Sequence, residues 1–96
     1  MTGELPKGTY PQIEELLVKE GYFKVYVWHD DPGQHYPPHV HEETVCLVVT
    51  AGSMQFSMNG EQSILRPGDR IVVPLGTEHT STALEQGCDF VEGEVL

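Results

Sequence analysis

The sequence predicts an all-β domain of the sandwich or barrel type, and three observations support this fold class. Runs rich in aromatic and β-branched residues recur along the chain, as in Tyr22–Asp30 and Arg70–Val73. Clusters of Gly, Pro, Asn and Asp separate these runs about every 8–12 residues, a rhythm typical of sandwiches and barrels. Asn59-Gly60 is a strong hairpin pattern, because both residues tolerate a positive φ.

Length and composition narrow the class of protein further. The 96 residues suffice for one small domain, and the formal net charge is −10 with His neutral. Nucleic acids and anionic membrane surfaces attract basic patches, so we expect neither as a partner. The chain has no apolar run near the ~20 residues that span a bilayer, and its N-terminus lacks the features of a secretory signal. We therefore expect a cytoplasmic protein.

Two cysteines, Cys46 and Cys88, are too few to form a disulfide framework. We interpret them as reduced thiols. A single Cys46–Cys88 disulfide is the alternative.

Residues 1–21 are expected to form an N-terminal arm with a short helix, and residues 22–96 a single barrel domain. The first nine residues have the composition of a loose arm. Pro11 suits the first turn of a helix, where its missing N–H costs nothing. Ile13, Leu16 and Leu17 would then form one apolar stripe, and Gly21 would cap the helix. An extended arm is the alternative.

The first predicted strand, Tyr22–Asp30, alternates between two apolar faces. One face holds Phe23, Val25 and Val27. The other holds Tyr26 and Trp28, which would pack in the core or at a dimer interface.

The remaining strands are expected to be short. Val45–Val49 is a continuous apolar run, as in a strand that is buried on both faces. Met54, Phe56 and Met58 alternate with polar residues and are expected to line the barrel. Turns are predicted at 51–53 and 85–87. The predicted strands are Gln34–Val49, Met54–Met58, Glu61–Leu65, Arg70–Val73, Glu78–Leu84 and Cys88–Val95.

His39-Val40-His41 is the clearest indication of chemistry. On a strand, two histidines one residue apart point to the same face, with Cα atoms ~7 Å apart. Both imidazoles can then reach one metal ion at ~2.0–2.1 Å. Two ligands rarely suffice, so a third is expected elsewhere in the chain.

Two longer spacings indicate where the third ligand lies. The first is Gly33-x5-His39-x-His41, followed by Gly52, and the second is Gly68-x5-Pro74-x-Gly76-x2-His79. Together they resemble the two motifs of the cupin superfamily, small proteins with a jelly-roll barrel (a double-stranded β-helix). The resemblance covers Gly33 to about Ala83. It implies that His39, His41 and His79 bind a divalent metal inside the barrel.

Two positions depart from the cupin pattern. Val45 stands where the first motif usually has a glutamate ligand, and Ala83 where the second usually ends in Asn. Three histidines with water still form an open metal site, as in some cupin dioxygenases. Glu43 shares strand parity with both histidines, so either Glu43 or water is the candidate to replace the missing carboxylate.

Other reactive side chains receive ordinary structural roles. Cys46 lies at an offset similar to that of a cysteine in cupin cysteine dioxygenases, but no tyrosine follows His41 to pair with it. We interpret Cys46 as a core residue, and His29 and His35 as hydrogen-bonded structural histidines. Arg70 is expected at the surface or rim; pointing inward, it would anchor an anionic substrate.

Two functions follow from these features. The first is a metal-dependent enzyme of the dioxygenase or isomerase type, with Fe, Zn, Mn or Ni at the three histidines and a small-molecule substrate. The second is a non-catalytic module that binds a small molecule or senses a metal. Small cupins are commonly homodimers, so a dimer is expected, with the first strand as the candidate contact.

Overall fold

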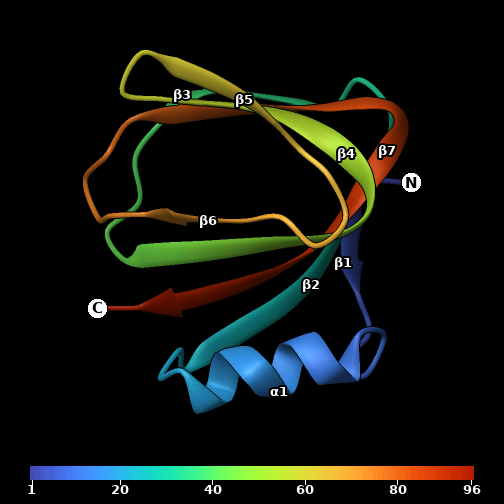
Figure 1. Ribbon diagram of the computed structural model, residues 1–96, viewed down its shortest axis with the longest axis vertical. Coiled ribbons are helices and arrows are strands. Elements are labelled where there is room, and N and C mark those ends of the chain that lie inside the picture. The colour runs from blue at the N-terminus through green and yellow to red at the C-terminus, as the bar shows by residue number, and fades with distance from the viewer.

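The computed structural model describes residues 1–96 and contains seven strands and one helix (Figure 1). All strand pairs are antiparallel, which confirms the predicted all-β class. The 9-residue helix α1 is too short and too polar to cross a membrane. The elements are β1 (Gly3–Leu5), α1 (Pro11–Lys19), β2 (Lys24–Asp30), β3 (His35–His39), β4 (Thr44–Met58), β5 (Glu61–Leu65), β6 (Arg70–Val73) and β7 (His79–Val95).

Two long, bent strands build the barrel. β4 and β7 pair with each other along almost their whole length and curve together from one layer of the barrel into the other (Figure 1). In one layer, β3 pairs with β7 and β5 pairs with β4. In the other layer, β2 pairs with β7 and β6 pairs with β4. The predicted chain-reversing turns at 51–53 and 85–87 are therefore wrong, because the two strands stay paired and only shift register there.

Glycines make this shared bend possible. Gly52 has φ +69°, and a Cβ at this position would lie 2.1 Å from the carbonyl oxygen of Gly87. Gly87 has φ +73°, and a Cβ there would lie 2.7 Å from the carbonyl oxygen of Asp30. Since any side chain would collide with backbone, only glycine fits at either corner.

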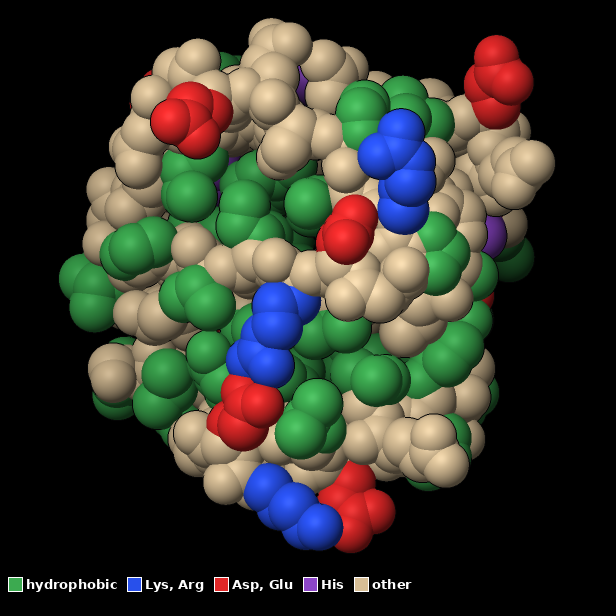
Figure 2. Space-filling model, viewed as in Figure 1, with side chains coloured by type: hydrophobic (Ala, Val, Ile, Leu, Met, Phe, Trp, Pro, Cys, Tyr) green, Lys and Arg blue, Asp and Glu red, His purple; other side chains and the backbone are tan.

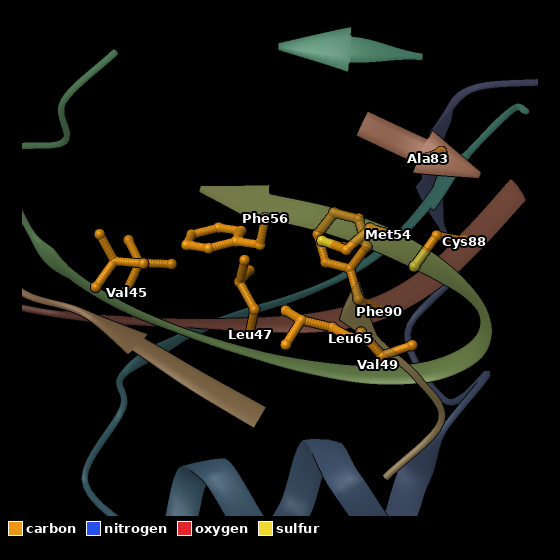
Figure 3. Close-up of a cluster of buried hydrophobic side chains, with 10 residues drawn as sticks. Val45, Leu47, Val49, Met54, Phe56, Leu65, Ala83, Cys88 and Phe90 are labelled. Atoms are coloured by element: carbon orange, nitrogen blue, oxygen red, sulfur yellow. The ribbon is translucent and has the colours of Figure 1, made fainter. Parts of the chain in front are cut away.

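The core has two parts. Ten buried side chains lie between the two layers, and Figure 3 shows Met54 and Phe56 facing Leu47 and Phe90 across the barrel. The expectation that Met54 and Phe56 line the barrel is confirmed. The second part lies between the sheet and α1, and contains Leu17, Val25, Val27, Cys46, Val48 and Val91.

The N-terminal arm is more ordered than predicted. Gly3–Leu5 pairs with β2, so the expected loose arm is wrong for these residues. The helix is confirmed, with Pro11 at its start and Gly21, at φ +104°, directly after its cap residue Glu20. Leu17 is fully buried but Leu16 is 42% exposed, so the buried stripe of the helix is narrower than predicted.

Both faces of β2 are covered within one chain. Val25 and Val27 are buried beneath α1, whereas Tyr26 and Trp28 line the barrel interior. Among the apolar residues of this segment, only Phe23, just before the strand, is exposed, at 60%. The strand therefore offers little of the contact surface expected of it.

Candidate metal centre

Three segments that are distant in the sequence bring the histidines together. His39 ends β3 and lies opposite His79, the first residue of β7, in the sheet register. His41 follows β3 in the connection to β4, and its carbonyl accepts a hydrogen bond from the N–H of Gly76 (2.9 Å). That bond ties the loop before His79 to the His39–His41 segment. The predicted continuous strand ends at His39, but the two side chains still converge.

The three imidazoles form a compact group. One nitrogen from each ring lies within 4.8 Å of those from the other two. The ring centres are 4.2 Å apart for His39 and His79, 4.9 Å for His41 and His79, and 5.0 Å for His39 and His41. Phe56 stacks beside His79 with ring centres 5.6 Å apart, which adds an apolar wall. The structure thus brings together all three histidines that the sequence singled out.

Hydrogen bonds fix which nitrogen each ring presents. Nδ1 of His39 lies 2.7 Å from the carbonyl oxygen of Pro37, and Nδ1 of His79 lies 2.9 Å from that of Thr77. A carbonyl only accepts, so Nδ1 carries the proton and donates it. The Nε2 lone pair of each neutral ring is therefore free for a metal, as in many protein metal sites.

The surroundings also favour the neutral, metal-binding form of the rings. Burial lowers the pKa of His41 and His79, and the neighbouring histidines lower it further. His79 is only 5% exposed. A neutral imidazole is the form that binds a metal, so nitrogen donors in this state suit Zn, Fe, Ni or Mn.

Carboxylates near the site do not complete the ligand set in this structure. Val45, at the position of the usual glutamate, is buried in the barrel core. Oε2 of Glu43 lies 3.4 Å from Nζ of Lys24, at ion-pair distance but without hydrogen-bond geometry. Glu43 is therefore directed towards Lys24 and is not part of the histidine group. Water is left as the candidate for the open positions.

The remaining histidines and cysteines have structural contacts. His29 pairs with Asp89 and Asp31, and His35 Nδ1 lies 2.7 Å from Oγ1 of Thr82. Cys46 and Cys88 are free, buried and part of different core clusters, which supports reduced thiols over a disulfide. Burial raises the pKa of the Cys88 thiol to about 12, so this thiol is unreactive.

Arg70 lies outside the barrel. Its guanidinium makes a two-pronged ion pair with Glu20, just after α1. It does not point inward, so it cannot anchor an anionic substrate in the barrel.

A cavity of about 380 Å³ lies inside the barrel, lined in part by His39 and His41. Glu92 and Glu94, neighbours on the inner face of β7, contribute carboxyl groups to it. Burial raises the pKa of Glu92 to about 8, and Glu94 beside it adds to the shift. Sequence reasoning missed both residues. Alternation along 90–94 would have placed them on the face of Phe90, and that is the pattern that could have found them.

Fold and site together define a class of protein. It is a double-stranded β-helix barrel with a cluster of three histidines and a small-molecule-sized cavity. The chain belongs to the cupin family, because residues 26–90 match the family described as Cupin domain. No curated protein matches the chain.

Solved structures of the same fold include enzymes. The chain is similar to KdgF from Halomonas sp. (30% identity, TM-score 0.67, 71% of this chain and 64% of that one). It is similar to the DMSP lyase DddQ from Ruegeria pomeroyi (26% identity, TM-score 0.70, 75% of this chain and 37% of that one). It is also similar to an oxalate decarboxylase variant from Bacillus subtilis (25% identity, TM-score 0.66, 74% of this chain and 20% of that one). The chain thus spans less than two thirds of each of these proteins.

Proposed function

We propose that this cupin binds one divalent metal ion through His39, His41 and His79 and acts with it on a small molecule in the barrel. The observation that carries the proposal is the presentation of free Nε2 atoms by two rings whose Nδ1 protons are held by backbone carbonyls. Three nitrogen ligands leave coordination positions open for water and a ligand. A metal bound in this way supplies Lewis-acid or, for iron, redox chemistry.

A catalytic role is favoured over simple binding by one feature of the cavity. Glu92 is half-buried beside Glu94, which raises its pKa to about 8, and it lines the same cavity as His39 and His41. A carboxyl group that titrates near the working pH suits a general acid or base. Tyr36 is the weaker candidate, since burial and its bond to Asp30 raise its pKa to about 12. The relatives named above include a lyase and a decarboxylase, which fits an enzyme.

Elemental analysis of untagged protein tests the metal site. We expect about one equivalent of a transition metal in the wild type and almost none in His39→Ala. His35→Ala is the matched control, because His35 lies on the same strand but outside the group. Equal metal content in all three proteins, or none in any, would contradict the proposal.

We also propose a cytoplasmic homodimer. Free, buried thiols fit a reducing compartment. Figure 2 shows hydrophobic side chains over much of the face that it presents. Large apolar side chains with more than half of their surface exposed include Phe23, Val40 and Leu75. Light scattering coupled to gel filtration tests this expectation: a mass near that of two chains supports it, and the mass of one chain contradicts it.

A further inference from the structure

The barrel cavity combines carboxyl groups with aromatic rings. Acidic side chains come from β7 and from β1 at the rim. The rings belong to β2, β3 and β7, and in the sheet register Tyr26 lies directly opposite Glu92, and Trp28 directly opposite Phe90. The carboxyl-bearing and aromatic residues that line the cavity are Glu4, Glu92, Glu94, Tyr26, Trp28, Tyr36 and Phe90.

None of the five Lys and Arg residues lines this cavity. Arg70 and Lys19 pair with Glu20 and Glu15, respectively. Lys24 lies opposite Glu94 in the register, but its Nζ is directed to Glu43 at 3.4 Å. The remaining two, Lys7 and Arg66, are exposed. The chain therefore provides no Lys or Arg counter-ion for the carboxyl groups in the cavity, whose only other nitrogen groups that titrate are His39 and His41.

A buried carboxylate, Asp30, fixes two of the rings. It is 2% exposed and accepts hydrogen bonds from Trp28 Nε1 (2.7 Å) and the Tyr36 hydroxyl (2.8 Å). These bonds occupy the polar atoms of both side chains. The rings are thus held in place as cavity wall, and the negative charge beside them increases their attraction for a cation.

Two carboxyl groups, Glu92 and Glu94, lie on the cavity face of β7 with no Lys or Arg beside them in the cavity. Burial is the main cause of the raised pKa of Glu92, and Glu94, Glu43 and Asp30 add to it. In most proteins a carboxylate that is withdrawn from water is paired with a cation. No Lys or Arg lines this cavity, so the positive charge beside these carboxyl groups comes from the metal proposed at the histidines or from a bound ligand.

We propose that the ligand of this cavity is a small organic cation, carrying an ammonium or similar onium group that Glu92 and Glu94 balance and Tyr26, Trp28 and Tyr36 surround. The proposal rests on the proposed function only in assuming that the ligand enters the same cavity. It adds the class of substrate, and in the metal-free protein it disfavours purely anionic molecules. A cation held against aromatic faces and a carboxylate gains both cation–π and ionic attraction.

The only tryptophan, Trp28, lines the cavity and reports binding by its fluorescence. The probes are choline, its neutral carbon analogue 3,3-dimethylbutan-1-ol and the anion 3,3-dimethylbutyrate, titrated into metal-free and zinc-loaded protein at constant ionic strength. We expect choline to bind about tenfold more tightly than the neutral analogue, and the anion most weakly.

Variants test which carboxyl groups cause the preference for choline. Glu94→Gln and the double variant Glu92→Gln/Glu94→Gln are expected to reduce the preference for choline about threefold and about tenfold, respectively. Glu85→Gln, an exposed residue on the same strand, is the matched control and should leave the preference unchanged. Circular dichroism confirms folding, and the three-probe comparison in the wild type needs no variant.

Failure of this inference is distinct from failure of the proposed function. Equal binding of choline and its neutral analogue, or tighter binding of the anion, in the metal-free protein overturns the inference, even if elemental analysis finds metal at the histidines. A choline preference in metal-free protein supports the inference, even if no metal is found. A choline preference that Glu92→Gln/Glu94→Gln retains in full would overturn the assignment to these carboxyl groups.

Discussion

Two regions of the barrel use histidine in opposite ways. At the three-histidine cluster, burial and the neighbouring imidazoles lower the pKa values of His41 and His79. At the other region, Asp89 and Asp31 flank His29 and raise its pKa. Burial without a directly paired carboxylate favours the neutral imidazole, whereas a carboxylate partner at hydrogen-bond distance favours its charged form.

This difference decides what each region does. A neutral imidazole with a fixed tautomer can bind a metal. A charged imidazole between two carboxylates forms ion pairs instead. Asp31 also contacts the chain's amino terminus and Thr2, and Asp89 accepts a hydrogen bond from Tyr10 (2.7 Å). His29 therefore belongs to a polar cluster that attaches the N-terminal arm to the barrel.

The largest expected effect is on metal affinity. Replacing His79 by Ala removes one of three ligands and should weaken zinc binding at least about 100-fold, since loss of a mere supporting contact costs 10–100-fold. His29→Gln should change zinc affinity less than about twofold, because His29 lies outside the ligand group. Competition with a chromogenic chelator measures both. A similar loss of zinc affinity in the two variants would contradict the assignment of metal binding to the histidine cluster alone.

The next effect concerns Glu92, a half-buried carboxyl group that, unlike Asp89, has no histidine partner. Its pKa rises from 4.5 to about 8 on folding, so between these pH values the folded state binds more protons than the unfolded state, and stability falls as pH increases. Glu92→Gln removes this dependence. The free energy of unfolding of the variant, relative to the wild type, should therefore be about 2 kcal/mol higher at pH 8 than at pH 5. Urea denaturation at the two pH values provides the measurement. A variant that is less stable than the wild type at pH 8 would contradict the assignment.

A smaller effect is expected for His29, with a defined pH dependence. Its pKa is raised in the folded state, so its ion pairs stabilise fully below the ordinary pKa of 6.5, and that contribution is lost as pH rises through the folded pKa. His29→Gln should therefore cost about 1–2 kcal/mol at pH 5.5 and less at pH 9. Thermal unfolding across this range gives the profile, and a cost that grows with pH would contradict it.

The smallest effect is a shift in titration, which separates the two regions directly. In metal-free protein, NMR of the imidazole C–H groups should place the midpoint of His29 above 6.5 and those of His41 and His79 below it. Histidine-to-glutamine variants assign the resonances. If all three histidines titrate together near 6.5, their surroundings do not differ as described.

Much of the three-histidine cluster could be predicted from the sequence, because spacing within a fold determines which side chains converge. The resemblance to cupins correctly grouped His39 and His41 with His79, which lies 38 residues beyond His41. The carbonyl partners of the Nδ1 atoms could not be foreseen, since they depend on how each loop bends. The direction of Glu43 towards Lys24 likewise depends on where the strand after His41 begins.

The fold class was predictable, but its corners were not. Gly52 and Gly87 look like chain-reversing turns when each is taken alone. In the barrel, β4 bends at Gly52 and β7 bends beside it at Gly87, so the hydrogen-bonded pairing between the two strands continues through the bend. The cavity was missed for a similar reason. Glu92 lies between Tyr26 and Leu47 in the sheet register, and these two partners come from strands that are distant in the sequence.

X-ray absorption spectroscopy of the zinc-loaded protein can identify the ligands that hold the metal. The multiple scattering of imidazole rings counts histidine ligands independently of activity. We predict three imidazole nitrogens and one or more oxygens around the metal in the wild type, and two imidazoles in His79→Ala loaded at higher zinc concentration. A first shell with fewer than two imidazoles in the wild type, or one unchanged by His79→Ala, would contradict a metal centre built from His39, His41 and His79.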